Sequence, residues 1–290
     1  MRVDLWIPTA SPFATPELLA VLGAEAEARG FSTLWVGEHV VLFEEYASSY
    51  PYAADGRVPV PSGTGLLEPL STLTFLAAHT STVRLGTAML LLPQRNPVYT
   101  AKEVATVDWL SSGRVDLGVG VGWLEEEFRA LDVPWAQRGR RTDEYLEVLS
   151  TLWNDETSQF AGEFYSLEAC QMFPKPVQSP VPVHIGGESD AALARVARAG
   201  HGWHTFNRAP ADLAAPLARL DELLAGSGRS RSDITITVCP YLEPLDADTT
   251  ARYAEAGADA VAALVVPLDA DSLRAQFDAL APVLERAASI

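Results

Sequence analysis

The sequence has very little cysteine and lacks a long apolar run. Its two cysteines, Cys170 and Cys239, lie far apart without a CxxC spacing. This arrangement argues against a disulfide framework and a zinc site, so reduced thiols and no bound metal are expected. The amino-terminal apolar run ends at Pro8 after one basic residue, too short and wrongly flanked for a signal peptide or a membrane span. A cytoplasmic protein without membrane contact is therefore expected.

Positive charge is also scarce. The chain has 21 basic against 38 acidic residues, which gives a net charge of −17, and Lys102 and Lys175 are its only lysines. Without a basic cluster, a nucleic-acid partner is not expected, because binding to phosphates depends on such clusters. With 48% apolar and 20% charged residues, the 290-residue chain can bury a large core. We expect one domain over residues 1–290, a length within the range of α/β barrels.

Short β-branched runs alternate with longer helical patterns along the whole chain, as in repeated βα units around a parallel sheet. Eight strands are predicted, at Val3–Pro8, Thr33–Gly37, Val83–Leu91, Arg114–Gly120, Val181–Gly186, Gly202–Phe206, Ile234–Cys239 and Ala260–Val266. Eight helices are predicted, at Pro16–Arg29, Pro69–His79, Pro97–Leu110, Gln137–Trp153, Ser189–Ala199, Pro210–Ala225, Ala247–Ala256 and Ala270–Ala288. This pattern favours an α/β fold of the (β/α)₈ TIM-barrel type, with a doubly wound open sheet as the alternative.

Two connections are too long to be simple turns. Residues 40–67 follow the second strand at the end where barrel enzymes place their chemistry, and Tyr46 and Tyr50 make this segment a candidate wall of a substrate pocket. Residues 154–180 precede the fifth strand and contain FAGEFYSL, which predicts a hairpin around Gly162. Both segments are expected to be insertions in the barrel.

An acid and an imidazole follow the second strand directly. Glu38 and His39 lie where the carboxyl ends of barrel strands form active sites, which favours a catalytic role for the pair. A structural histidine that makes a hydrogen bond at the strand end is the alternative. His204, near the end of the sixth strand, is a further candidate for the substrate pocket.

Glycines at strand ends suggest close approach of a ligand. The fifth strand leads through Gly186, Gly187 and Glu188 to Ser189, which can cap the next helix, and the amino terminus of that helix attracts phosphate. A tight βα turn is the alternative. The fourth strand ends in GVGVGW, where Gly120 and Trp123 could border a flat ring or only pack under a loop. This run lacks the GxGxxG spacing and distal acid of a Rossmann site.

The third strand carries small residues before Ala88 and Met89, which can mark a bulge under a cofactor. Arg95 follows it and is one of the few cations that could bind an anionic ligand, although a solvated loop charge is an equal alternative.

Taken together, these segments resemble the luciferase-like monooxygenase superfamily, most closely its deazaflavin (coenzyme F-420)-dependent oxidoreductase branch. The resemblance covers nearly the whole chain. It rests on LWVGEHV, EYASSYPYAADGRVPVP, VRLGTAMLLLPQRNP, LSSGRVDLGVGVGWLEEEF, RGRRTDEYLEVLSTLW, FYSL and VPVHIGGES, in this order and spacing.

The resemblance implies a TIM barrel whose cofactor ring lies over the bulged third strand, at Ala88 and Met89, which such proteins often join by a non-proline cis peptide. It implies that His39, with Glu38 beside it, faces the reactive ring, and that the loop from Gly186 to Ser189 holds phosphate. Homodimers are common in the superfamily, and helices two and three are the expected contact surface.

Two catalytic functions and one non-catalytic function follow from the resemblance. The first is hydride transfer between coenzyme F-420 and a small organic substrate. The second is an FMN-dependent monooxygenase that uses reduced flavin from a separate reductase and oxygen. The third is a barrel that binds cofactor without turnover. Relatives that oxidise sugar phosphates carry lysines for the phosphate, whereas no lysine follows Lys175 here, so the sequence disfavours that substrate class.

Overall fold

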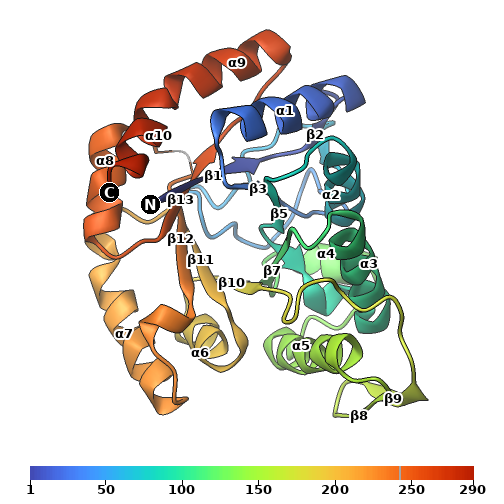
Figure 1. The fold of residues 1–290 in the computed structure, drawn as a ribbon. Coiled ribbons are helices and arrows are strands. Elements are labelled where there is room, and N and C mark those ends of the chain that lie inside the picture. Colours follow the sequence, from blue (N-terminus) through green and yellow to red (C-terminus); the bar gives the residue numbers. More distant parts are fainter. Residues whose placement is uncertain (242) are drawn as a thin grey trace.

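The computed structural model describes residues 1–241 and 243–290. Eight parallel strands form a closed barrel, which Figure 1 shows surrounded by helices. The strands are β1 (Arg2–Ile7), β3 (Thr33–Val36), β5 (Arg84–Thr87), β7 (Val115–Gly120), β10 (Val183–Gly186), β11 (Gly202–Phe206), β12 (Thr235–Cys239) and β13 (Ala260–Leu264). The decisive pairing joins β7 to β10, with Val183 opposite Leu117. Because this pairing closes the ring, the predicted barrel is confirmed and the open sheet was wrong.

Helices cover the outer face of the barrel (Figure 1). They are α1 (Pro16–Arg29), α2 (Pro69–Ala78), α3 (Pro97–Leu110), α5 (Arg138–Asn154), α6 (Asp190–Ala199), α7 (Ala214–Gly226), α8 (Ala247–Glu255), α9 (Ala270–Ala279) and α10 (Ala281–Ala288). The local signals explain their ends: Thr15 caps α1 by accepting a hydrogen bond from the Leu18 amide, and Gly30 ends it at a φ of 85°. Their apolar sides pack on the strands to form the main hydrophobic core.

The last predicted helix, Ala270–Ala288, is wrong in one respect, because the structure divides it into α9 and α10 around Leu280. Pro282 explains the break. Proline lacks an amide proton, and its ring would collide with the carbonyl group four residues earlier in a continuous helix.

The predicted third strand, Val83–Leu91, is also interrupted. It forms β5 and the short β6 (Leu90–Leu91), and the peptide between Ala88 and Met89 is cis, as the resemblance implied. A 3₁₀ turn at Leu92–Gln94 follows β6, and two more lie at Pro210–Asp212 and Arg231–Asp233.

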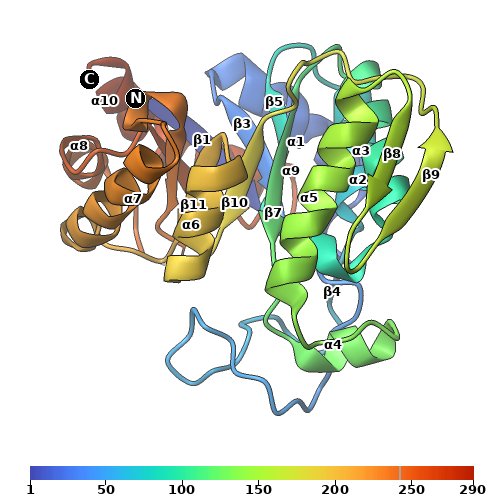
Figure 2. The same ribbon diagram turned by 90° about the horizontal axis from the view of Figure 1, so that it is seen from below.

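The two insertions lie on different sides of the barrel. Residues 40–67 extend beyond the carboxyl ends of the strands, next to the short helix α4 (Glu125–Ala130), which was not predicted (Figure 2). Within this insertion β4 (Gly65–Leu66) pairs with β2 (Ala10–Ser11). The hairpin predicted around Gly162 is confirmed as β8 (Ser158–Ala161) and β9 (Ser166–Cys170), beside α5. In the described part of the chain, the helices are too short or too polar to cross a bilayer.

Candidate active site at the barrel mouth

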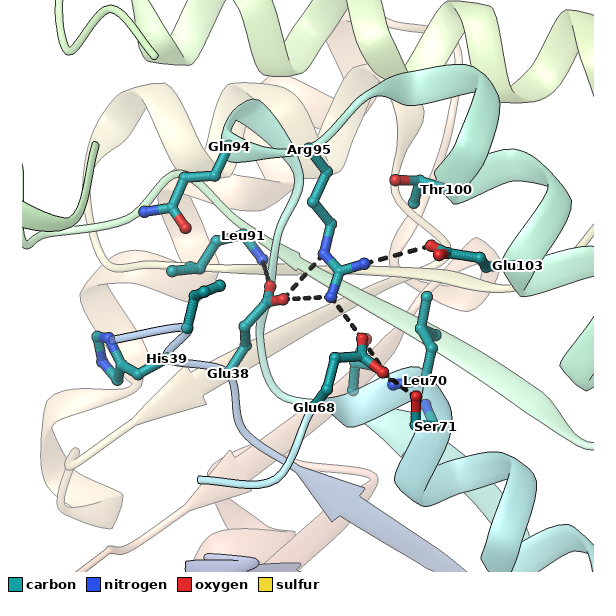
Figure 3. A network of polar contacts seen from close by, with 12 residues as sticks. Glu38, His39, Glu68, Leu70, Ser71, Leu91, Gln94, Arg95, Thr100 and Glu103 are labelled. Atoms are coloured by element: carbon teal, nitrogen blue, oxygen red, sulfur yellow. Dashed lines mark hydrogen bonds and ion pairs between the residues drawn. The ribbon is translucent and has the colours of Figure 1, made fainter. Parts of the chain in front are cut away.

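Glu38 and His39 leave the end of β3 in different directions (Figure 3). The buried Glu38 carboxylate accepts hydrogen bonds from the Leu91 amide at 2.5 Å and from Arg95 Nε at 2.8 Å. Burial raises the pKa of Glu38, while the charge and hydrogen bonds of Arg95 oppose that rise. Glu38 therefore holds the chain after β6 against the end of β3, and His39 alone of the pair faces the mouth.

Arg95 has three carboxylate partners, so it is not the free ligand for an anion that the sequence suggested. Besides Glu38, its guanidinium contacts Glu68 at 2.5 Å and Glu103 at 3.3 Å (Figure 3). Glu68 also caps α2 by accepting hydrogen bonds from the Leu70 and Ser71 amides. These contacts join three segments that lie far apart in the sequence.

The imidazole of His39 is held on both sides. Trp123 Nε1 lies 3.3 Å from His39 Nε2, and because an indole N–H can only donate, Nε2 is the acceptor. The proton of the neutral ring is then on Nδ1, which donates to Glu127 Oε2 at 3.2 Å. Glu127 therefore fixes the tautomer and the orientation of the ring, and the lone pair of Nε2 accepts from Trp123 at the barrel mouth.

Glu127 is the main site residue that sequence reasoning missed. Its side chain is 0% exposed and also accepts hydrogen bonds from the Val40 amide at 2.6 Å and Gln94 Nε2 at 3.1 Å. Burial favours a higher pKa, but the hydrogen bond and charge of His39 and the other donors outweigh it, so the pKa of Glu127 is lowered. The signal available was the acidic run from Glu125 to Glu127 directly after the fourth barrel strand.

The floor of the mouth is the segment around Ala88 and Met89. Trp6 Nε1 donates to the Ala88 carbonyl oxygen at 3.0 Å. A Cβ at Gly120 would lie 2.9 Å from Met89 Cβ, and one at Gly186 would lie 2.6 Å from Met89 Cγ. Glycine is needed at both positions because these two strand ends close around Met89. The structure thus brings together four residues that the sequence assigned separately to a cofactor.

The loop from Gly186 to Ser189 turns at a glycine with positive φ and leads into the capped start of α6. Gly187 has a φ of 111°, and Ser189 Oγ accepts a hydrogen bond from the Ala192 amide at the start of α6. The Glu188 carboxylate accepts hydrogen bonds from Thr205 Oγ1 and the Phe206 amide, both at 2.9 Å, and pairs with Arg208. The arginine thus offsets the negative charge of Glu188.

The insertion 40–67 forms the outer wall of the mouth. Tyr46 and Tyr50 pack edge to face on Trp123, with ring centroids 5.6 and 5.1 Å apart. Glu126 holds this wall by accepting hydrogen bonds from the Ala47 amide and Ser48 Oγ, both at 2.7 Å. Burial favours a higher pKa for Glu126, but these hydrogen bonds outweigh it and lower the pKa to about 2.

His204 lies inside the barrel instead of at its mouth, so its expected place in the substrate pocket was wrong. It is 1% exposed, and its ring packs edge to face on Trp35 with centroids 4.9 Å apart. Burial lowers the pKa of His204 to about 3, which keeps the ring neutral. His204 and Phe206 are two residues apart in β11 and so lie on the same face of the strand, but His204 lies deeper in the barrel than Phe206, which ends the strand.

The comparisons with known proteins decide the family. The family model described as luciferase-like monooxygenase matches residues 2–284. The chain belongs to the luciferase-like monooxygenase family. Its members include F420-dependent and FMNH₂-dependent oxidoreductases, and this chain is an oxidoreductase of that family.

Three relatives show the range of this luciferase-like family. An uncharacterised protein of Mycobacterium tuberculosis is 33% identical over 285 residues, which cover 98% of this chain and 99% of that protein. The F420-dependent glucose-6-phosphate dehydrogenase of Kineococcus radiotolerans is 31% identical, over 79% of this chain and 64% of its own length. The FMNH₂-dependent dimethylsulfone monooxygenase of Pseudomonas putida is 30% identical, over 61% of this chain and 49% of its own length.

The fold of this luciferase-like chain agrees with solved structures. An F420-dependent secondary alcohol dehydrogenase in complex with an F420–acetone adduct superimposes with a TM-score of 0.77, over 99% of both chains at 16% identity. At this identity the likeness supports the fold alone.

Proposed function

We propose that this protein transfers hydride between coenzyme F-420 and a small organic substrate at the carboxyl ends of the barrel strands. The observation that supports the proposal is His39, whose Nδ1 is held by Glu127 while its Nε2 accepts only the exchangeable N–H of Trp123. When bound, the deazaflavin would accept or supply the hydride. His39 Nε2 would take the proton of a substrate hydroxyl in place of the Trp123 N–H, or return it in the reverse direction, and Glu127 would stabilise the imidazolium.

The residues present fit such a cofactor. Glycines close around the floor at Met89, and the loop from Gly186 to Ser189 leads into α6 with a backbone that only glycine adopts easily at Gly187. The two carboxylates beside that loop are each paired with an arginine, Glu188 with Arg208 and Asp190 with Arg219. A phosphate could therefore lie at the start of α6 without meeting uncompensated negative charge.

An FMN-dependent monooxygenase is the second candidate. The FMNH₂-dependent relative favours it, and the same loop at Gly187 could hold the FMN phosphate. In that case reduced flavin would come from a separate reductase. A barrel that binds cofactor without turnover would lack the proton transfer assigned to His39.

We expect the purified apoprotein to bind coenzyme F-420 more tightly than FMN when the two are titrated separately. Gly187→Val should weaken binding of the preferred cofactor by about tenfold or more, because the branched side chain obstructs backbone approach and its Cβ would lie 3.3 Å from Ala192 Cβ. Gly226→Val is the matched control, since a Cβ at Gly226 meets no atom within 4 Å. Thermal unfolding of each variant separates lost binding from lost folding.

A clear preference for FMN would contradict the F-420-dependent hydride transfer and favour the FMN-dependent monooxygenase. Unchanged cofactor affinity in folded Gly187→Val would contradict the placement of phosphate at this loop, whichever cofactor binds.

A homodimer formed through α3 is part of the proposal. The outer face of this helix exposes Tyr99 (72%) and Trp109 (57%), together with Leu110, and apolar surface of this kind commonly marks an interface. Light scattering should therefore give twice the chain mass of 31.2 kDa. Trp109→Glu should shift the mass toward the monomer, whereas Leu268→Glu, at an exposed site away from α3, should not. A monomer at micromolar concentration in the unmodified protein would contradict this proposal.

A further inference from the structure

Six aromatic side chains from five segments form a continuous wall around the mouth, which we call the aromatic mouth. They are Trp6, Tyr50, Tyr52, Trp123, Phe206 and Tyr241. The contacts run from the His39 ring to Trp123 at 5.6 Å between centroids, and from Trp123 to Tyr50 at 5.1 Å. Tyr50 and Tyr241 are buried, whereas the other four rings are partly exposed and can bind a flat apolar group.

The far side of the aromatic mouth is equally apolar. Phe206 lies 4.6 Å from Tyr241, 4.9 Å from Tyr52 and 5.7 Å from Trp6, measured between ring centroids. Phe206 is half-buried, so it connects the two sides while part of its surface stays open to a ligand. The wall therefore offers contact area chiefly from rings.

The polar groups of the aromatic mouth are neutral hydroxyls. Burial raises the pKa of the Tyr50 phenol above its usual range, and burial also raises the pKa of Tyr241. Both hydroxyls keep their protons at neutral pH, and because Tyr50 donates to Tyr241, the Tyr241 hydroxyl is the one that can donate to a carbonyl or alcohol oxygen.

The arginines near the mouth are engaged in different ways, Arg208 and Arg95 with carboxylates, and Arg57 and Arg138 with aromatic rings and backbone carbonyls. Arg208 pairs with Glu188, Arg95 with its three glutamates, and Arg57 stacks on Tyr46 with its guanidinium carbon 4.5 Å from the ring centroid. Both lysines donate to backbone carbonyls elsewhere, Lys102 to that of Phe173 and Lys175 to those of Leu152 and Asp155. An incoming anion would have to compete for these cations.

Negative charge, in contrast, adjoins the mouth. The lowered pKa values of Glu126 and Glu127 keep both carboxylates ionised at neutral pH, and they lie behind Ser48 and His39, respectively. Their field disfavours an anion more strongly in a partly buried site than in water.

We infer that the substrate is a neutral aromatic or similarly apolar alcohol or ketone, and that the aromatic mouth excludes carboxylated and phosphorylated substrates. The inference rests on the proposed function, because the substrate oxygen would lie beside His39. The rings of the mouth supply the binding surface, the Tyr241 hydroxyl holds the oxygen, and the carboxylates behind Ser48 and His39 disfavour anions.

The test uses two probes that share a ketone and a benzene ring, acetophenone and 4-acetylbenzoate, with glucose 6-phosphate as a third. Calorimetry and quenching of tryptophan fluorescence should give a Kd for acetophenone at least about tenfold lower than for either anion. Phe206→Ala should raise the acetophenone Kd by about fivefold or more, because it removes the ring that joins both sides of the mouth. Phe173→Ala, which removes an exposed ring in the segment after β9, is the matched control and should leave that Kd unchanged.

Equal or tighter binding of either anion, no measurable binding of acetophenone, or an unchanged Kd in folded Phe206→Ala would overturn the inference. Affinities for coenzyme F-420 and FMN, measured in the same preparations, separate it from the proposed function. Cofactor binding without the neutral preference overturns the substrate inference alone. The neutral preference without binding of either cofactor overturns the proposed function alone.

Discussion

Replacing His39 with alanine should lower kcat by about 100-fold or more while leaving the protein folded. The imidazole is the proton-exchanging group at the mouth, and its Nε2 is oriented by the contact between Nδ1 and Glu127. Loss of a merely structural hydrogen bond would instead lower the free energy of unfolding by about 1 kcal/mol and change chemistry little. Glu127 keeps its hydrogen bonds from Val40 and Gln94 in the variant, so its buried carboxylate stays satisfied.

Pre-steady-state absorbance of the cofactor, followed with the alcohol or ketone that turns over, measures the chemical step directly. Thermal unfolding of the same samples measures stability. His79→Ala is the matched control, because this exposed histidine hydrogen-bonds only near its own helix end, to the Phe75 carbonyl oxygen. Near-normal chemistry combined with a lowered melting temperature in His39→Ala would show that the residue is structural.

Replacing Arg95 with methionine should lower the free energy of unfolding by about 3–5 kcal/mol, because it leaves the buried Glu38 carboxylate without its charge partner. The guanidinium is only 16% exposed and joins Glu38 to Glu68 and Glu103, so water cannot replace it fully. Urea unfolding of the variant measures the loss. Arg274→Met removes an exposed ion pair with Glu25 and should cost less than about 1 kcal/mol.

The stability loss in Arg95→Met should depend on pH in a definite direction. The pKa of Glu38 is already raised in the folded protein and should rise further without Arg95. A raised folded pKa means that stability falls as pH increases from the unfolded value toward the folded one, so the loss in Arg95→Met should be largest above neutrality and shrink in acid. Adding Glu38→Gln to Arg95→Met should recover much of the stability, since no buried charge then remains unpaired. A loss independent of pH and of Glu38 would contradict this account.

The sequence was informative where short-range rules decide the structure. Alternating βα patterns and helix caps such as Thr15 predicted the strands and helices, because these signals act within a few residues. Pro282 also carried the signal for the break between α9 and α10, although the apolar pattern across it suggested one helix. The resemblance placed His39 and the segment at Ala88 and Met89 because motifs in that order and spacing are specific in combination.

By itself, then, the sequence determined the eight βα units, the position of Glu38 and His39 directly after the second barrel strand, and the luciferase-like resemblance. Only the tertiary structure decided that β7 pairs with β10 to close the barrel, because that choice depends on how far the whole sheet twists and coils. Only the tertiary structure showed which of the three consecutive glutamates contacts His39. The orientation of α4 brings Glu127 to the imidazole, although the two residues are 88 positions apart in the sequence. The tertiary structure also moved Arg95 into an ion-pair network and His204 into the barrel interior, because a side chain's partners and its depth in a barrel depend on neighbouring strands that the local sequence does not specify.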